Sequence, residues 1–327
     1  MTIQETSLPV VSILIPTYNR EDLIGECIES ALNQTFTDIE VIIVDNASTD
    51  RTWEICQEFE RRDPRVSIFR NESNIGPVRN WLRCAQEARG KYSKILFSDD
   101  LMAPEFIACT LPLLQDDSVA FAFSAAYIGP TIETGVINYS NGPKTIYSIE
   151  EYLRLLLYWK VPYSPGAALF RTADIRKHLH DTLPTCTHHD FWRHGAGPDV
   201  LLYALTAVDY PTVAAVKEPL VLFRAHADSI STYNKNNEVS DGYRAALSWF
   251  YAKRESNSLW YEYLSKHWFR KLKLHRSWVS IGSFLIEHEG TGSTKQQITF
   301  LSKTLVLPIS RAYRKYVTSI NVQKTHA

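Results

Sequence analysis

The feature that most constrains the fold is a regular alternation of short apolar runs with segments of helical periodicity. The runs at 10–15, 40–44 and 66–70 each end at a polar or turn residue, as buried strands do. Between the first two runs, six apolar residues recur on one face of a helix: Leu23, Ile24, Cys27, Ile28, Ala31 and Leu32. Such alternation, at a spacing of about 25–30 residues, predicts βαβ units and a mostly parallel sheet covered by helices on both faces.

The second half of the chain is less regular. We expect strands at 95–97, 119–124 and 166–171 and helices at 149–160 and 200–208. The polar segments 129–147 and 181–198 predict long loops, the first of them a loop or a hairpin. Beyond about residue 240 the periodicity is helical. The fold class is therefore α/β, with a helical C-terminal region.

Composition excludes several classes of protein. The five cysteines form no CxxC pair and are odd in number, which argues against a disulfide framework or a zinc site and fits a reducing compartment. The first ten residues lack the basic and apolar regions of a signal peptide. No apolar run approaches the roughly 18–20 residues that span a bilayer. We therefore expect a cytoplasmic protein, or one attached to a membrane from the cytosolic side.

Polar residues follow the predicted strands at the edge where α/β sheets bind ligands. They are the segments 16–19, 45–48, 71–76 and 98–100. Neither GxGxxG nor GxxxxGK[ST] occurs there, so dinucleotide-dependent hydride transfer and P-loop phosphoryl transfer lack their usual motifs. Asp99 and Asp100 suit a hard divalent cation that bridges a diphosphate. Asp45 suits a ribose or base contact, and Tyr18 suits stacking on a base. By spacing alone, two adjacent aspartates in a turn are more often a solvated turn or a helix cap than a metal site.

Longer stretches of the chain resemble a known family. They are VSILIPTYNREDLIGECIESALNQTFTDIEVIIVDNASTDRTWEI, NESNIGPVRNWLRCAQEARGKYSKILFSDD and GAALFR, and in this order they resemble inverting glycosyltransferase family 2, of GT-A fold. The resemblance covers roughly residues 9–231. It implies a glycosyltransferase domain at 1–235, with a nucleotide-sugar half at 9–128 and an acceptor half at 129–235, followed by a helical region at 236–327.

The resemblance also implies roles for individual residues. Nucleotide-sugar contacts fall on Pro16, Thr17, Tyr18, Asp45, Asn74, Gly76, Arg79, Ser98 and Asp99. Asp100 matches the metal ligand of the acidic motif, and the segment RAHADSIS places His226 at the metal or diphosphate. The implied cofactor is Mg²⁺ or Mn²⁺. The family usually has a further acidic residue where this chain has Phe97.

The catalytic base of the family falls on Asp199, in the segment GPDVLLY. Pro198 replaces the acidic residue that usually precedes it. A carboxylate there would take the proton of the acceptor hydroxyl, whereas the structural alternative is a helix N-cap. Asp190 is the competing candidate for the base. No family motif matches His188, His189 or His194. We predict that they are loop residues near the acceptor.

The resemblance implies transfer of a sugar from a nucleotide-diphospho-sugar, a UDP-sugar, to a glycan or lipid-linked acceptor in cell-surface polysaccharide biosynthesis. A nucleotide-sugar-binding module with impaired catalysis is the alternative, and Phe97 and Pro198 favour it. A nucleotidyltransferase would need a basic, glycine-rich loop after the first strand, where this chain has none.

The C-terminal region has a distinct charge. Residues 251–327 contain 13 Lys or Arg and 4 Asp or Glu, whereas the whole chain has a net charge of -1. Lys and Arg alternate there with Trp, Phe and Leu, a pattern typical of a helix on an anionic membrane surface. Packing against the core is the alternative. No nucleic-acid recognition motif accompanies the charge, so we expect no nucleic-acid partner. These observations predict a peripheral protein on the cytoplasmic face of the inner membrane.

Overall fold

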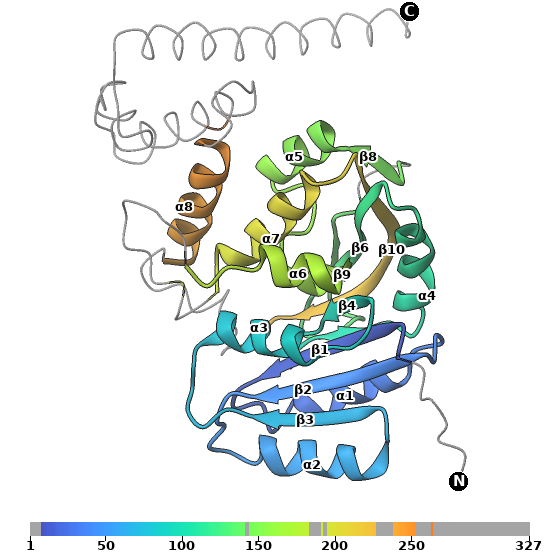
Figure 1. The fold of residues 1–327 in the computed structure, drawn as a ribbon, viewed down its shortest axis with the longest axis vertical. Helices are drawn as coiled ribbons and strands as arrows, with labels where there is room; N and C mark the ends of the chain where they lie inside the picture. Colours follow the sequence, from blue (N-terminus) through green and yellow to red (C-terminus); the bar gives the residue numbers. More distant parts are fainter. Residues whose placement is uncertain are drawn as a thin grey trace, which may run out of the picture. The chain divides into compact units, whose positions relative to one another are not determined.

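The fold is taken from a computed structural model. It describes residues 8–140, 144–182, 191, 195–226, 238–252 and 263. The chain divides into two compact units, Met1–Leu247 and Ser248–Ala327, and the account below concerns the first (Figure 1). Apart from α8 (Glu238–Ala252) and residue 263, the predicted C-terminal helical region lies outside the described residues. The domain boundary after residue 235 stays a prediction.

The first half consists of three consecutive strand–helix units. The strands are β1 (Val11–Thr17), β2 (Ile39–Asp45) and β3 (Val66–Arg70), which pair in parallel. Every residue of β1 and β2 is buried, which explains why their sequences are apolar without alternation. The helices are α1 (Ile24–Leu32), α2 (Thr52–Arg62) and α3 (Pro77–Glu87). The elements predicted in this half are therefore confirmed.

A single mixed sheet runs through the unit. Its strand order is β3-β2-β1-β4-β9-β6-β10-β5. β4 (Tyr92–Ile95) extends the parallel half beside β1. β9 (Ala168–Arg171) is antiparallel to both β4 and β6 (Val119–Gly129), whereas β10 (Thr212–Arg224) runs parallel to β6. The short strands β5 (Leu101–Met102), β7 (Val136–Asn138) and β8 (Ile146–Ser148) pair antiparallel to β10 or β6.

The carboxyl ends of β1 and β4 separate at Pro16. The Leu14 carbonyl accepts a hydrogen bond from Leu96, and the Thr17 carbonyl accepts one from Asn46. The backbone N–H and C=O groups of successive residues in a strand point to alternate sides. The backbone of Pro16 therefore faces β4, where a proline has no N–H to donate. The pairing of β1 with β4 accordingly ends at Leu14, whereas its pairing with β2 continues to Thr17. The chain reverses its direction of winding between β1 and β4, so this opening is the switch point of the sheet.

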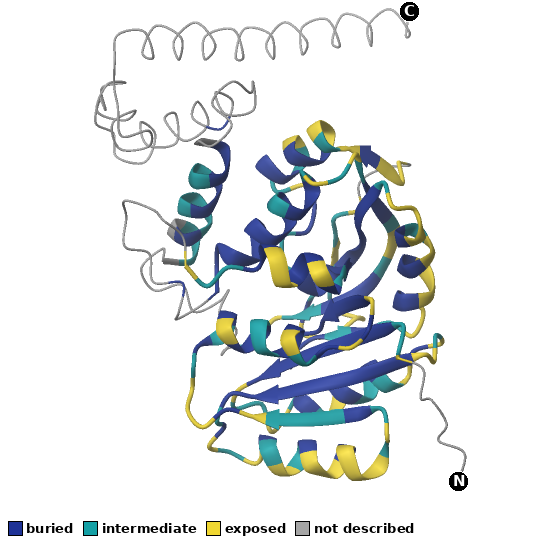
Figure 2. Cartoon of the chain, in the orientation of Figure 1, coloured by how far each residue is buried: buried dark blue, intermediate teal, exposed yellow. Residues whose placement is uncertain are grey.

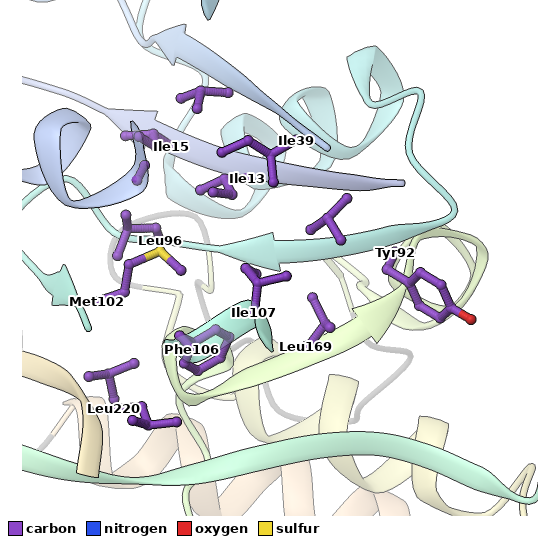
Figure 3. Packing of buried hydrophobic residues seen from close by; sticks show 14 of the residues in the cluster. Ile13, Ile15, Ile39, Tyr92, Leu96, Met102, Phe106, Ile107, Leu169 and Leu220 are labelled. Carbon is purple, nitrogen blue, oxygen red and sulfur yellow. The ribbon is translucent and has the colours of Figure 1, made fainter. Parts of the chain in front are cut away.

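Helices cover both faces of the sheet. α1 and α2 contact each other, and α1 also contacts β5. α4 (Phe106–Thr110) and the 3-10 helix η1 (Leu111–Gln115) pack on the adjacent part of this face. α3 contacts α6 (Thr172–His178), and α6 contacts α7 (Pro198–Ala207). A large buried cluster of side chains from β1, β2, α1 and α4 packs the helices of this first face, α1 and α4 among them, against the sheet (Figures 2 and 3).

Two strands differ from the prediction: β4, which follows the three strand–helix units, and β10, which lies in the acceptor half. The strand predicted at 95–97 is β4, Tyr92–Ile95; its buried polar residues Ser93 and Lys94 hide it from an apolar pattern. Ser93 Oγ lies 2.7 Å from Thr172 Oγ1, and Lys94 Nζ donates to the carbonyls of Ile95 and Gly166. β10 was not predicted, because Lys217 and Glu218 interrupt its apolar pattern at an irregularity in its pairing with β6.

The remaining elements follow the prediction more closely. α5 (Ile149–Leu157) begins at a capping box formed by Ser148 and Glu151, and the 3-10 helix η2 (Pro165–Ala167) precedes β9. The segment 129–147 contains β7, which pairs antiparallel with the end of β6 as in a hairpin, and the start of β8, which pairs with β10. No helix in the described part of the chain is long and apolar enough to cross a membrane.

We predict that the buried carboxylate of Glu40 contributes strongly to stability. It accepts hydrogen bonds from Ser12 Oγ at 2.6 Å and from Arg89 N at 2.7 Å. Glu40→Ala leaves these donors unpaired, so we expect the free energy of unfolding to fall by about 2–4 kcal/mol in urea titrations. Glu29→Ala breaks an exposed pair with Arg62, and this control should cost less than about 1 kcal/mol. Equal losses in the two variants would contradict the prediction.

Candidate active site

The ends of β1 and β2 place the first predicted residues side by side. Thr17 and Asp45 are register partners at the last residues of the two strands. Thr17 is buried, and no hydrogen-bond partner for its Oγ1 is found among the described residues. Tyr18 follows directly and is 41% exposed. An aromatic ring that is exposed beside the open end of a sheet is available for stacking on a planar ligand.

Asp45 is fully buried and is held by the chain itself. Its carboxylate accepts hydrogen bonds from the N–H and the hydroxyl of Ser48, and Arg70 Nε lies 3.0 Å from its Oδ2. The Arg70 guanidinium also lies over the ring of Trp53, 5.2 Å from its centre. Asp45 therefore shapes the turn that follows β2, besides any contact that it makes with a ligand.

A network of asparagine side chains connects this turn to the loop before α3. Asn46 donates to Asn74 Oδ1 at 2.9 Å, and Asn71 donates to Asn46 Oδ1 at 2.8 Å. Asn71 also donates to Asn80, which donates to the carbonyl of Val44. Sequence reasoning missed Asn46, Asn71 and Asn80, because their role depends on contacts between segments about 30 residues apart. Such a satisfied buried network holds its loops rigidly.

Asn74, Gly76 and Arg79, which match one family motif, differ in their surroundings. Asn74 Oδ1 also accepts the N–H of Gly76 at 2.9 Å, so its side chain holds the turn. Gly76 has φ of 82° and precedes the first turn of α3, a conformation that favours glycine. Arg79 projects from α3, is 54% exposed and pairs with Asp181 at 2.9 Å. Of the three, only Arg79 presents a charged group at the surface.

The acidic turn follows β4 at the switch point. Asp99 Oδ2 lies 3.0 Å from His226 Nε2 and 3.6 Å from an Arg20 nitrogen. Asp100 is buried, and its Oδ1 accepts the backbone N–H of Arg224 at the end of β10. β10 therefore brings His226, predicted from a distant motif, to the acidic turn. Its direct partner is Asp99 rather than Asp100. Ser98, the first residue of the turn, is buried.

The donor set of this turn fits a divalent cation. Burial and the adjacent Asp99 carboxylate raise the pKa of Asp100 well above its usual range, and a cation beside the pair would relieve that cost. Within residues 8–140, 144–182 and 195–226, no group of three His, Cys, Asp or Glu side chains is arranged to hold a metal. Mg²⁺ commonly takes one or two carboxylates and completes its coordination with substrate phosphates and water. Two carboxylates with a neighbouring histidine meet that requirement.

Asp199 lies at the start of α7 and is 7% exposed. Its Oδ1 accepts the N–H groups of Gly197 and Val200, each at 2.8 Å, and its Oδ2 accepts the Tyr243 hydroxyl at 2.7 Å. Burial raises the pKa of Asp199 to about 7, although these hydrogen bonds oppose the rise. A carboxyl group with this pKa exchanges a proton near neutral pH, as a general base requires.

One indole ring connects Asp199 to the acidic turn. The ring centres of Trp81 and Phe97 are 5.0 Å apart, and Phe97 immediately precedes the turn. A Cβ placed on Gly195 would lie 2.6 Å from the same indole, so the loop that leads to Asp199 also packs on Trp81. Phe97 thus has a packing role at the position where the family usually has an acid. The Phe97 carbonyl also accepts the N–H of Asp100.

Several predicted residues cannot be placed. Asp190, the competing base, and His188, His189 and His194 lie outside the described residues. The basic and aromatic residues predicted to meet a membrane also lie there, apart from those in α8 and residue 263. Tyr243 was missed for a different reason: it is about 44 residues from Asp199, in a helix without a family motif, so no sequence signal connects the two.

Comparison with known proteins identifies relatives for most of the chain. A model described as glycosyl transferase family 2 matches residues 12–179. EpsH of Bacillus subtilis strain 168, named as a glycosyltransferase, is 29% identical over 240 residues, which are 68% of this chain and 62% of EpsH. The Escherichia coli enzyme WfaP is 36% identical over 144 residues, which are 43% of this chain and 55% of WfaP. WfaP is named as a UDP-Glc:α-D-GlcNAc-diphosphoundecaprenol β-1,3-glucosyltransferase. The chain therefore spans less than two thirds of either relative.

Solved structures match the fold more completely. Staphylococcus aureus TarS 1–349 in complex with UDP-GlcNAc superimposes with a TM-score of 0.64 at 16% identity, over 93% of this chain and 91% of that one. The mannosyltransferase PcManGT of Pyrobaculum calidifontis, in complex with GDP-Man and Mn²⁺, gives 0.55 at 17% identity, over 96% and 84%. The predicted GT-A fold is confirmed by this likeness.

We predict that Asp199→Asn stabilises the fold at alkaline pH. The pKa of Asp199 is about 7 in the folded state and near 3.8 in the unfolded state. Between about pH 4 and 7 the folded state therefore binds one more proton than the unfolded state, and its stability falls as pH rises through this range. Asparagine is isosteric and avoids this cost. Its free energy of unfolding should match that of the natural chain near pH 4 and exceed it by on the order of 4 kcal/mol at pH 8.

The control for this prediction is Asp209→Asn. Lys177 and His178 lower the pKa of Asp209, so its ionised form stabilises the fold, and the loss on substitution should grow as pH rises towards about 4 and stay nearly constant from about pH 5 to 8. If Asp199→Asn and Asp209→Asn show the same sign of pH dependence, the assignment of Asp199 as a buried, costly carboxylate is wrong.

Proposed function

The chain belongs to glycosyl transferase family 2, and from that premise we propose that it is an inverting glycosyltransferase. The donor is a nucleotide-diphospho-sugar, most simply a UDP-sugar, and the acceptor is a hydroxyl group of a glycan or a lipid-linked glycan in cell-surface polysaccharide biosynthesis. The names of the relatives support the donor and the acceptor: WfaP uses UDP-Glc and a diphosphoundecaprenol acceptor, and TarS binds UDP-GlcNAc.

The observation that carries the proposal is the environment of Asp199. A buried carboxylate with a pKa of about 7, held by two backbone N–H groups and a tyrosine, stands at the start of α7, and the loop before it packs on the same indole as Phe97, the residue before the acidic turn. A carboxylate that served only as a helix N-cap would gain nothing from burial, which makes its charged form costly. A general base requires this balance between burial and hydrogen bonding.

The reaction is a single displacement. Asp199 takes the proton of the acceptor hydroxyl while its oxygen forms a bond to the anomeric carbon. The bond from that carbon to the diphosphate oxygen breaks on the opposite face, so the anomeric configuration inverts. Tyr18 stacks on the base of the donor, and the ends of β1 and β2, with Thr17 and Asp45, contact the nucleoside. Pro16, Asn74, Gly76 and Ser98 form the backbone and turns around it, and Arg79 lies beside the phosphates.

Asp100, with Asp99 and His226 beside it, would hold Mg²⁺ or Mn²⁺. When bound there, the cation neutralises the negative charge that develops on the departing diphosphate. PcManGT, whose structure contains GDP-Man and Mn²⁺, supports a cation of this kind. The hydrogen bond between His226 and Asp99 orients the acidic turn, and Arg20 adds positive charge at the same carboxylate.

A nucleotide-sugar-binding module with impaired catalysis is the second candidate. The observation in its favour is Phe97, whose ring packs on Trp81 where the family usually has a third acidic residue. Such a module binds the donor in the presence of Mn²⁺ but neither transfers nor hydrolyses it. Activity, rather than binding, separates the two candidates.

We predict a separable loss of binding and chemistry in two variants. A screen of UDP-, GDP- and dTDP-sugars by thermal shift with Mn²⁺ identifies the donor. Asp199→Asn should retain that shift and lose transfer by about 10²–10⁴-fold. Asp100→Asn should lose the Mn²⁺-dependent part of the shift. Asp117→Asn, which changes a carboxylate that is 94% exposed, should leave both unchanged. Full transfer by Asp199→Asn would contradict the role of the base.

The proposed site of action is the cytoplasmic face of the membrane, because the basic, aromatic C-terminal region suits an anionic surface. We expect the full chain to float with vesicles that contain phosphatidylglycerol and not with pure phosphatidylcholine vesicles. Higher salt should weaken the association. Absence from both vesicle fractions, or equal flotation with both, would contradict the membrane assignment without affecting the proposed chemistry.

A further inference from the structure

The hydroxyl of Tyr243 completes the contacts of the Asp199 carboxylate. Oδ1 is occupied by the two N–H groups at the start of α7, and Oδ2 accepts the Tyr243 hydroxyl at 2.7 Å. A carboxylate oxygen has two lone pairs. With one used by Tyr243, Oδ2 keeps one for a further hydrogen-bond donor, whereas Oδ1 already accepts two. The contacts therefore select a single oxygen and a single direction from which Asp199 can accept a proton.

Aromatic packing holds the Tyr243 ring in place. Its centre lies 5.6 Å from that of Trp159 and 5.1 Å from that of Tyr163, both in tilted edge-to-face contacts. Trp159 has a φ of 55°, a conformation that costs a bulky residue energy and persists only where its surroundings require it. The preceding residue, Gly242, brings its carbonyl within 3.1 Å of a Cβ built on Gly197. Helix α8 thus packs closely against the turn that presents Asp199.

We infer that Tyr243 is a positioning residue for the general base, an inference that rests on the proposed function. It orients Oδ2 of Asp199 and stabilises the ionised form of the carboxylate by donating a hydrogen bond. The proton of Tyr243 is not transferred: it stays on the phenol oxygen, and the acceptor proton moves to the free lone pair of Oδ2. The N-terminal half of α8, which lies beyond the region matched by the family, is therefore part of the active site.

The charges around Asp199 agree with this role. The titratable groups that face it, in the part of the chain that the structure describes, are the phenols of Tyr163, Tyr203 on α7 and Tyr243 on α8. Burial and the nearby carboxylate raise the pKa of Tyr243 well above its usual range, so it remains a donor at every pH of interest. Its hydrogen bond lowers the pKa of Asp199 against the effect of burial.

The test compares Tyr243→Phe with a matched control, Tyr210→Phe. Tyr210 donates to Asp174 at 2.8 Å, so both variants remove one hydroxyl from a tyrosine–aspartate pair, and only the first pair is in the site. A hydrogen bond to a charged group is worth about one pKa unit. In Tyr243→Phe the acidic limb of the kcat/KM profile should therefore move up by about one pH unit. Activity should fall about tenfold below pH 7 and recover at pH 9.

A second measurement keeps the inference testable without a known substrate. The difference in unfolding free energy between a protein and its Asp199→Asn derivative varies with pH up to the folded-state pKa of Asp199. In the Tyr243→Phe background the upper end of this range should move up by about one pH unit, and in the Tyr210→Phe background it should not move. An unmoved upper end with Tyr243→Phe, or an equal decrease of activity at all pH values, would overturn the inference.

Different results would contradict the proposed function and the role of Tyr243. If no donor is transferred or hydrolysed, the proposed function is wrong, and the stability measurement still reports whether Tyr243 sets the proton affinity of Asp199. If transfer depends on Asp199 but Tyr243→Phe keeps the natural pH profile and the natural stability range, the function stands and the role of Tyr243 is wrong.

Discussion

The separation of β1 from β4 at Pro16 is the constraint on which the rest of the site depends. A proline that faces β4 cannot donate a ladder hydrogen bond, so the two central strands part after Leu14 while β1 continues beside β2. The opening lies at the switch point of the sheet, where the ends of the parallel strands present backbone and side-chain groups to a ligand. The acidic turn follows β4 directly, and β10 closes it from the other side through the N–H of Arg224 and the side chain of His226.

Charged groups in this protein are buried at a cost that their surroundings only partly offset. Asp100 and Asp199 both have a raised pKa because burial outweighs their hydrogen bonds. Lys94, which ties β4 to η2 through the carbonyl of Gly166, has its pKa lowered to about 7 because burial disfavours its charged form. Glu40 differs, because Ser12 and Arg89 satisfy it fully and it serves the fold alone. Costly, incompletely compensated carboxylates are typical of sites that do chemistry.

The first half of the fold was predictable because its signals are local. Each strand–helix unit contains its apolar run, its strand-end polar residues and its helical periodicity within about 25–30 residues, and the resemblance to the family gives the order of the motifs. β10 was not predicted because Lys217, Glu218 and Pro219 interrupt its apolar pattern. β4 was predicted at the wrong residues because Ser93 and Lys94 are polar although they are buried. Family motifs selected Asp99, Asp100 and Asp199 as candidate site residues. Arg224 and Tyr243, which donate hydrogen bonds to Asp100 and Asp199, come from distant segments, and only tertiary contacts reveal these pairs.

The central claim is that the nucleotide diphosphate binds at the opening between β1 and β4. The most direct measurement is a crystal structure of the full chain with UDP and Mn²⁺. We expect the uracil against Tyr18, the ribose near Asp45, and the cation at Asp100. A nucleotide bound elsewhere on the chain, or a cation held by residues other than the acidic turn, would contradict it.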